Sequence, residues 1–272
     1  MPAVSVMSYL LNLQPANDDF ALETTVILVK PDLAEVQLHF ESKVAARPAP
    51  LLISWRHPLI NSCHCWTPAA HLDHTIRPDW HPHAFTSRST SHAPVYTLYG
   101  MDGTNALTFA LSDCLQAIRL SAGVHEESAE AACQVTLFAE PMAPLLAYSV
   151  TLRLDRRPLP YYQILQETSA WWAGLPDYQP SPPPATSREP VYSTWYSFHQ
   201  DVSVAGLETQ CRLAKELGMS TLIVDDGWQT DDNSRGYAYC GDWEVTPNKL
   251  PDFQAHVERI HAIGLGSVSY TH

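Results

Sequence analysis

The sequence predicts an α+β protein of two parts, an antiparallel β-sandwich followed by a segment of parallel strands and helices. Strict alternation of apolar and polar residues over 33–40 and 146–154 predicts strands with one buried face. A proline-rich stretch over 176–190 separates the two parts. Beyond it, the apolar pattern follows the order strand, helix, strand, helix. The 272 residues, 45% of them hydrophobic, suffice for one large or two ordinary domains.

The first part, residues 1–160, is predicted to be a β-sandwich domain. Other runs rich in β-branched and apolar residues lie at 24–29, 51–55, 95–99, 106–111, 115–120 and 134–139. Asp102-Gly103 stands between two of them and is a hairpin turn signal. Many short strands at roughly even spacing favour an antiparallel sandwich. The His-, Pro- and Ser-rich stretch 63–92 predicts a long loop.

Residues 161–190 predict a linker that begins with a helix. Tyr161, Leu165, Thr168 and Trp172 recur at helical spacing. The following stretch, 176–190, contains six prolines, a composition typical of a stiff linker and a domain boundary.

The second part, residues 191–272, predicts a right-handed βαβ unit. The expected strands are 191–198 and 221–225. The helix between them has the apolar stripe Val204, Leu207, Cys211, Ala214 and Leu217 and stops at Gly218. A second helix begins with Asp252 as its N-cap and ends at Gly264. A third strand should follow, but the sequence ends Gly-Ser-Val-Ser-Tyr-Thr-His, so we expect the second strand to have an open edge.

The composition excludes several classes of partner. A formal charge of −13, from 16 basic and 29 acidic residues, argues against nucleic acid and against an anionic membrane. No apolar run has the length of a membrane span. Residues 1–13 lack the basic start of a signal peptide. The six cysteines contain no CxxC pair and are expected to be reduced thiols of a cytoplasmic protein.

The acidic pair Asp225 and Asp226 is the main candidate site. It follows a buried strand, and ligands of parallel sheets bind at the carboxyl ends of the strands. Carboxylates accept hydrogen bonds from sugar hydroxyls, and the indole of Trp228 can pack on a sugar ring. The competing interpretation is a turn in which one Asp caps the backbone. Metal binding with Asp231 and Asp232 is a second alternative, although the acidic residues lack the alternating spacing of a calcium loop.

The pair is not expected to be a catalytic acid and nucleophile. Retaining glycosidases need two carboxyl groups about 5 Å apart that face one bond. Neighbouring residues of a strand point to opposite sides of the sheet. We therefore assign Asp225 and Asp226 to substrate binding and no residue of this chain to catalysis.

Two further tryptophans are candidates for sugar binding. Trp195 lies on the predicted first strand, where an aromatic side chain belongs to the core more often than to a ligand site. Trp243 lies in a loop beside Gly, Asp and Glu, which favours binding over a core position. For His199, at the end of the first strand, a structural role is favoured over a catalytic one.

The long loop 63–92 also contains many potential metal ligands. Cys63, Cys65 and several histidines invite a zinc interpretation, but their spacing does not match a structural zinc site. Because Trp66 and Trp80 lie in the same loop, a segment that reaches over a sugar site is an alternative, as is an ordinary surface loop.

Several motifs of the second part resemble the α-galactosidases of glycoside hydrolase family 36. These are Trp195-Tyr196-Ser197, Leu217-Gly218, Asp225-Asp226-Gly227-Trp228, and Gly241-Asp242-Trp243 with Lys249-Leu250-Pro251. The resemblance is specific over about 190–265 and weaker over 1–190. It implies an N-terminal β-supersandwich, a linker helix and a (β/α)8 TIM barrel, of which this chain would hold the first two βα units.

The resemblance also implies roles for the site residues. Asp225 and Asp226 would hold hydroxyls of a terminal galactose, Trp195 would line the base of the pocket, and Trp243 would form its wall. The catalytic nucleophile and the acid/base of the family come from barrel strands four and six, so we expect this chain to be a fragment that is inactive alone.

The predicted function is therefore that of an α-galactosidase-like glycoside hydrolase of the retaining type. Its expected partners are α-galactoside oligosaccharides such as melibiose or raffinose, with no metal and no organic cofactor. A homo-oligomer is left open for a full-length form. Galactosyl transfer, as in raffinose and stachyose synthases, is one alternative, and a non-catalytic carbohydrate-binding β module is another.

Overall fold

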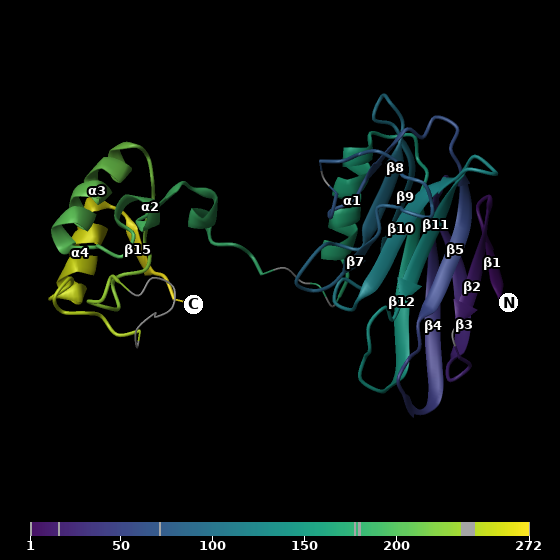
Figure 1. Ribbon diagram of the computed structural model, residues 1–272, viewed down its shortest axis with the longest axis horizontal. Helices are drawn as coiled ribbons and strands as arrows, with labels where there is room; N and C mark the ends of the chain where they lie inside the picture. The colour runs from purple at the N-terminus through teal and green to yellow at the C-terminus, as the bar shows by residue number, and fades with distance from the viewer. Residues whose placement is uncertain are drawn as a thin grey trace. The chain divides into compact units, whose positions relative to one another are not determined.

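The computed structural model describes residues 2–271 except 16, 71, 177, 179–180 and 235–242. The chain divides into two compact units, Met1–Pro180 and Ser181–His272, which we call the sandwich unit and the βα unit (Figure 1). Each unit has its own cluster of buried apolar side chains.

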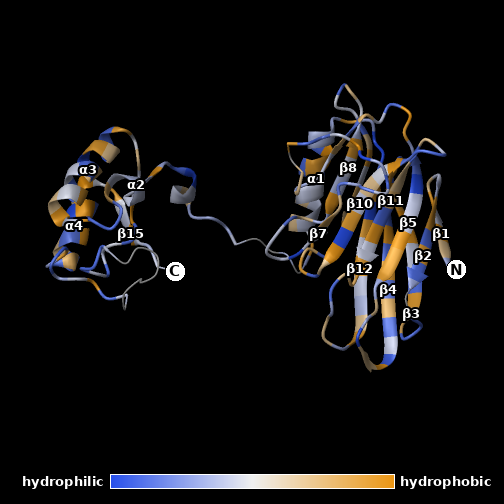
Figure 2. Ribbon diagram, viewed as in Figure 1, coloured by the Kyte–Doolittle hydropathy of each residue, from blue (hydrophilic) through white to orange (hydrophobic). Residues whose placement is uncertain are grey.

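Two antiparallel sheets form the sandwich unit. The first has the strand order β1 (Ala3–Val6), β2 (Tyr9–Pro15), β5 (Leu51–Pro58), β11 (Glu130–Leu137), β10 (Ile118–His125), β7 (Phe85–Ser87). The second has the order β3 (Ala21–Lys30), β4 (Leu33–Ala46), β12 (Leu145–Asp155), β9 (Asn105–Leu111), β8 (Val95–Tyr99), β6 (His64–Trp66). Buried and exposed residues alternate along strands such as β4, where Figure 2 shows alternating hydropathy. The buried side chains of both sheets form one core.

The predicted β-sandwich is thus confirmed, with local differences. Strand β10 begins at Ile118 and not at Leu115. The cause is Asp113, whose Oδ1 accepts hydrogen bonds from the backbone N–H groups of Leu115 and Gln116 at 2.8 and 3.0 Å. These bonds hold a turn where a strand was expected. The predicted long loop 63–92 contains the short strands β6 and β7.

The predicted helix after the sandwich forms as α1, Tyr161–Ala173. It packs on the sandwich unit, where the Trp172 indole Nε1 donates to the Leu111 carbonyl at 2.8 Å. Ile164 and Thr168 are buried on this face. After α1, residues 181–190 are exposed throughout and include one 3-10 turn, Ala185–Arg188.

The βα unit contains three parallel strands in the order β13 (Val191–Ser193), β14 (Thr221–Val224), β15 (Gly266–Ser269). Its helices are α2 (Trp195–Phe198), α3 (Val204–Glu216) and α4 (Phe253–Ile263). Asp252 caps α4 by accepting a hydrogen bond from the Ala255 N–H at 2.9 Å, and Gly264 ends the helix in the left-handed region, both as predicted.

Two predictions for the βα unit are wrong. The first strand ends at Ser193, because Thr194 takes a helical conformation and its carbonyl accepts from the N–H groups of Ser197 and Phe198. Trp195 therefore lies on α2 and not on a strand. The second strand also has no open edge, because β15 pairs with β14 from Thr221↔Gly266 onward.

Candidate functional site

The ends of the three parallel strands bring the predicted site together. Just beyond β13, the Thr194 N–H donates to the Ile223 carbonyl at 3.1 Å. Just beyond β15, the Tyr270 N–H donates to the Val224 carbonyl at 2.9 Å. The residues that follow all three strands therefore lie at one edge of the sheet. This is the edge at which parallel sheets bind their ligands.

Asp225 follows the central strand and is held in one orientation. Its N–H donates to Thr194 Oγ1 at 2.9 Å, which fixes its backbone to the end of β13. Its Oδ1 accepts from the Asp226 N–H at 2.9 Å, and its Oδ2 accepts from Ser193 Oγ at 3.3 Å. A carboxylate can accept about four hydrogen bonds, so this half-buried side chain keeps capacity for further donors.

Asp226 is much less accessible, with only 3% of the residue exposed. Its Oδ1 accepts from Gln229 Nε2 at 3.4 Å, while Gln229 Oε1 accepts from the Gly227 N–H at 2.9 Å. The Asp226–Gln229 segment is therefore a tight turn stabilised by its own side chains. This geometry combines the two sequence interpretations, because Asp225 caps the backbone and also presents a carboxylate at the strand end.

Gly227 allows two loops to touch at this point. Its φ of 108° lies in the region that favours glycine. A Cβ atom at this position would lie 2.3 Å from the Gln200 carbonyl oxygen. The loop after β13 and the loop after β14 are thus in direct backbone contact, which only glycine permits.

Lys249 connects these loops, and its sequence context predicted no role for it. Its Nζ donates to the carbonyls of Gln200 at 2.8 Å and Gly227 at 3.0 Å, and to Asn233 Oδ1 at 2.6 Å. Burial lowers the pKa of this ammonium below its usual value, and the nearby carboxylates of Asp201 and Asp231 act in the opposite direction. In the sequence, Lys249 is recognisable only as a lysine shortly before α4, and that position does not reveal its carbonyl partners.

A second set of contacts fixes the segment after Trp228. The Thr246 N–H donates to the Trp228 carbonyl at 2.9 Å. Thr246 Oγ1 and Asn248 Nδ2 both donate to the Asp231 carboxylate, and these bonds hold its pKa below the usual value. Asp231 thus serves to join two segments of the loop. Within the described ranges, no three His, Cys, Asp or Glu side chains cluster as a metal site would require.

The two tryptophans beyond β14 differ in accessibility. Trp228 is 5% exposed, belongs to the core of the βα unit, and donates from Nε1 to the Tyr270 carbonyl at 3.1 Å. These contacts favour a structural role for its indole. Trp243 is half-buried, and its ring centroid lies 6.1 Å from that of Trp228. Gly241 and Asp242 of the same motif lie outside the described residues.

Trp195 occupies the first position of α2, directly after the strand end. Its side chain is half-buried, and its ring meets the His199 ring at a centroid distance of 5.0 Å and an angle of 74°. His199 is exposed and has a φ of 49°. Trp195 directly follows Thr194, whose Oγ1 accepts a hydrogen bond from the Asp225 N–H. An aromatic residue is therefore the sequence neighbour of a residue that contacts Asp225.

The His-rich loop of the sandwich unit is held by ordinary side-chain contacts. Cys65 is buried and donates from Sγ to the Thr75 carbonyl at 3.3 Å. Asp73 pairs with Arg77 at 2.8 Å and with His83 at 3.4 Å. Hydrogen bonds from Thr75 and Arg77 lower the pKa of Asp73 well below its usual range. His71, which also belongs to this loop, lies outside the described residues.

No helix in the described part of the chain combines the length and the apolar character that crossing a membrane requires.

Known proteins resemble the sequence over a short stretch. Alpha-galactosidase Mel36A of Lactobacillus acidophilus is 33% identical over 82 residues, which is 29% of this chain and 11% of that protein. Alpha-galactosidase 1 of Pediococcus pentosaceus is 35% identical over 79 residues, which is 28% of this chain and 10% of that protein. No protein-family model matches the sequence.

Solved structures resemble the fold over almost the whole chain. The α-galactosidase AgaB of Geobacillus stearothermophilus, from glycoside hydrolase family 36, has a TM-score of 0.56 at 16% identity. It matches 96% of this chain and 37% of its own. The galactosidase domain of the α-galactosidase–sucrose kinase AgaSK has a TM-score of 0.55 at 15% identity, over 96% of this chain and 39% of its own.

The α-galactosidase AgaA of Geobacillus stearothermophilus is a further similar structure, solved with stachyose and with raffinose, at TM-scores of 0.55 and identities of 17% and 16%. Each of these two matches covers 96% of this chain and 37% of AgaA. The chain thus spans well under half the length of the proteins that it matches. The expected resemblance is confirmed: this chain is similar to the family 36 α-galactosidases, in fold over almost its full length and in sequence over about 80 residues.

Proposed function

We propose that this chain is the galactoside-binding part of a retaining α-galactosidase-type glycoside hydrolase. In this proposal the βα unit contributes the first strands of a (β/α)8 barrel, and its strand-end loops bind a terminal galactose. The observation that carries the proposal is Asp225, which the backbone of Asp226 and the hydroxyl of Thr194 hold at the end of the central strand with acceptor capacity to spare.

The other site residues have distinct proposed roles. Asp226 is the proposed second acceptor of sugar hydroxyls, although only 3% of the residue is exposed. Trp195 and Trp243 are half-buried, and in this proposal their rings pack on the apolar side of a pyranose, as the base and the wall of the binding site. Trp228 supports the site from the core.

The proposed substrates are α-galactoside oligosaccharides such as melibiose and raffinose. The complexes of AgaA with raffinose and stachyose support this substrate class. The proposed chemistry uses two carboxylates and needs neither metal nor organic cofactor. Asp225 and Asp226 are not proposed to be these two catalytic carboxylates, because they are adjacent in sequence and Asp225 already accepts hydrogen bonds from a backbone N–H and a hydroxyl. We therefore assign both residues to substrate binding.

Titration calorimetry with methyl α-galactoside and methyl α-glucoside tests this proposal. The two sugars differ only in the orientation of one hydroxyl, so the comparison isolates recognition of that group. We expect the purified chain to bind the galactoside more tightly, because the proposed site is one for galactose. Asp225→Asn should weaken binding by about tenfold or more, since a hydrogen bond to a charged acceptor contributes about 1.5–3 kcal/mol.

Glu216→Gln is the matched control, because it neutralises an exposed carboxylate on α3 in the same unit. It should leave the affinity unchanged. Equal affinity for both sugars, or full affinity in Asp225→Asn, would remove the basis of the proposal.

A further inference from the structure

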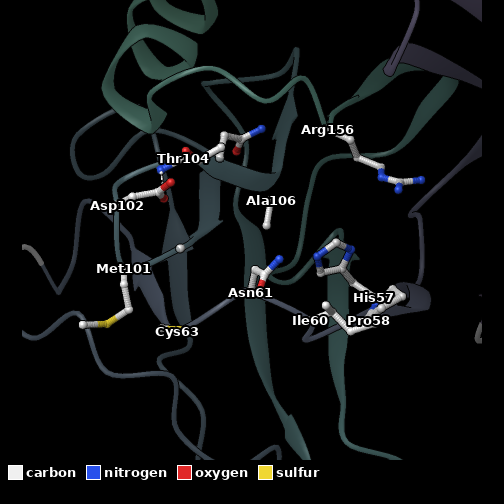
Figure 3. A pocket seen from close by; sticks show the side chains of 12 residues that line it. His57, Pro58, Ile60, Asn61, Cys63, Met101, Asp102, Thr104, Ala106 and Arg156 are labelled. Carbon is white, nitrogen blue, oxygen red and sulfur yellow. Dashed lines mark hydrogen bonds between the residues drawn. The ribbon is translucent and has the colours of Figure 1, made fainter.

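A cavity of about 650 Å³ lies in the sandwich unit and contains none of the predicted site residues. Figure 3 shows that its lining comes from three segments: the end of β5 with the loop beyond it, the β8–β9 turn with the start of β9, and the residue after β12. Its volume falls within the range of about 300–1,000 Å³ that is usual for small-ligand sites. Because these segments are distant in sequence, the cavity forms only when the sandwich unit is folded.

Two charged groups of this cavity, Arg156 and Asp102, are held by contacts within the protein. Arg156 Nη1 donates to Ser8 Oγ at 2.6 Å, and its guanidinium lies 5.3 Å from the centroid of the Tyr9 ring. Asp102 Oδ1 accepts from the Thr104 N–H at 2.9 Å. Figure 3 shows Asp102 and Arg156 at opposite sides of the view, with Ala106 between them. A preorganised site of this kind loses little entropy on binding.

The charges of the lining cancel. Arg156 contributes one positive charge and Asp102 one negative charge, and both line the cavity. His57 also lines it, and burial, assisted by the nearby Arg156, lowers the pKa of its imidazole to about 4. The ring is therefore neutral at pH 7. The described lining therefore has no net charge at pH 7.

One buried polar atom in the lining, His57 Nε2, has no hydrogen-bond partner among the described residues. His57 is 5% exposed, and its Nδ1 lies 2.8 Å from the Tyr9 hydroxyl. Its Nε2 makes no hydrogen bond with any residue that the structure describes. Buried ring nitrogens of this kind are normally hydrogen-bonded.

The rim of the cavity is apolar. Ile60 is 81% exposed and Met101 is 78% exposed, and both belong to the lining. Asn61 and Thr104 also line the cavity and add an amide and a hydroxyl. Apolar contact surface together with several neutral donors and acceptors matches the two faces of a sugar ring.

We propose that this cavity binds a neutral oligosaccharide, independently of the site in the βα unit. The binding uses the amide, hydroxyl, carboxylate and guanidinium groups for the sugar hydroxyls, and Ile60 and Met101 for the apolar ring faces. It goes beyond the proposed function and does not rest on it, because no residue is shared between the two sites.

Methyl NMR of the full chain, labelled with [¹³C-methyl]methionine and titrated with raffinose and with cellotriose, tests this inference. Met101 reports on the cavity, and its signal is assigned with Met101→Leu. We expect at least one trisaccharide to shift it in a saturable manner. Ala106→Gln, which fills the cavity from β9, should reduce the shift at least fivefold, and the Met7 signal, from a side chain packed on the sandwich core, checks the fold.

Two further variants make the outcome decisive. Ala147→Gln, on the exposed face of β12 and outside the cavity, should leave the Met101 shift unchanged, and Asp225→Asn should do the same. No saturable shift with either sugar would overturn the inference. So would a shift that survives Ala106→Gln, or one that disappears in Asp225→Asn.

Discussion

His57 links the stability of the sandwich unit to pH at the scale of one residue. Its folded-state pKa of about 4 lies below the unfolded value of 6.5, so the unfolded chain binds the proton more tightly. The contribution of the neutral His57 to the free energy of unfolding is therefore complete above pH 6.5 and is lost as the pH falls toward 4. A tenfold difference in proton affinity between the folded and unfolded chain corresponds to about 1.36 kcal/mol, so the loss should total roughly 3 kcal/mol.

Urea unfolding at pH 7.0 and pH 4.5, compared between the wild type and His57→Gln, measures this effect. The variant should lose less stability between the two pH values, because the titrating ring is gone. The same pH dependence in both proteins would show that His57 does not contribute.

Gly227 supports a second prediction at this scale. Gly227→Ala should destabilise the βα unit by about 2 kcal/mol or more, because a Cβ would lie 2.3 Å from the Gln200 carbonyl oxygen and φ is 108°. Gly218→Ala is the matched control, since Gly218 also has a positive φ but no atom lies within 4 Å of its ideal Cβ. It should cost only about 1 kcal/mol in urea unfolding. Equal costs for the two variants would show that the close contact of the loops is not needed.

Site residues can be predicted from the sequence where their immediate neighbours in the chain indicate the local structure. Asp225 and Asp226 follow an apolar strand, and that order alone indicates a strand end. Lys249 could not be assigned, because its partners are mainly carbonyls of Gln200 and Gly227, and carbonyls leave no trace in a sequence. The Trp228 indole also bonds to a carbonyl, that of Tyr270, so its place in the core could not be predicted from the sequence either.

At the scale of the elements, Lys249 holds together the loops that follow β13 and β14. Lys249→Met keeps the apolar stem but removes three hydrogen bonds from the ammonium. Loss of these bonds, one of them to the buried residue Gln200, should lower the free energy of unfolding of the βα unit by on the order of 2 kcal/mol.

Lys215→Met is the control for this change in urea unfolding. Lys215 donates one hydrogen bond, to the Gly264 carbonyl at 2.8 Å, and its residue is exposed. Its loss should cost less than about 1 kcal/mol. A Lys249→Met protein as stable as Lys215→Met would contradict the role given to Lys249.

Periodicity predicted the elements well where one face of a strand or helix is buried, as in β4, β12 and α3. It failed over 191–198, where Val191, Tyr192 and Ser193 pair with β14 and the next residues turn into α2. Aromatic residues such as Trp195 suit either structure, so composition could not locate the boundary. The third strand, Gly266–Ser269, was missed because its short alternating sequence gains stability only by pairing with β14.

At the scale of the whole molecule, the two units should behave as separate structures. Residues 181–190 are exposed throughout and contain Arg188. Brief trypsin digestion should therefore cut after Arg188 and leave fragments 1–188 and 189–272, with the sandwich unit the more resistant because its core is larger. Arg188→Gln should abolish this first cut. Early cleavage within the sandwich strands would contradict the division into two units.

Asp225 and Asp226 are proposed to bind galactose at the ends of the parallel strands. The most direct measurement is the ¹³Cγ chemical shift of selectively labelled aspartates during titration with methyl α-galactoside, with Asp225→Asn and Asp226→Asn used for assignment. We predict that the Asp225 signal moves most, that Asp226 moves less because it is buried, and that methyl α-glucoside moves neither to the same extent. Two unmoved signals at galactoside concentrations that saturate the calorimetric response would place the sugar elsewhere and contradict this account.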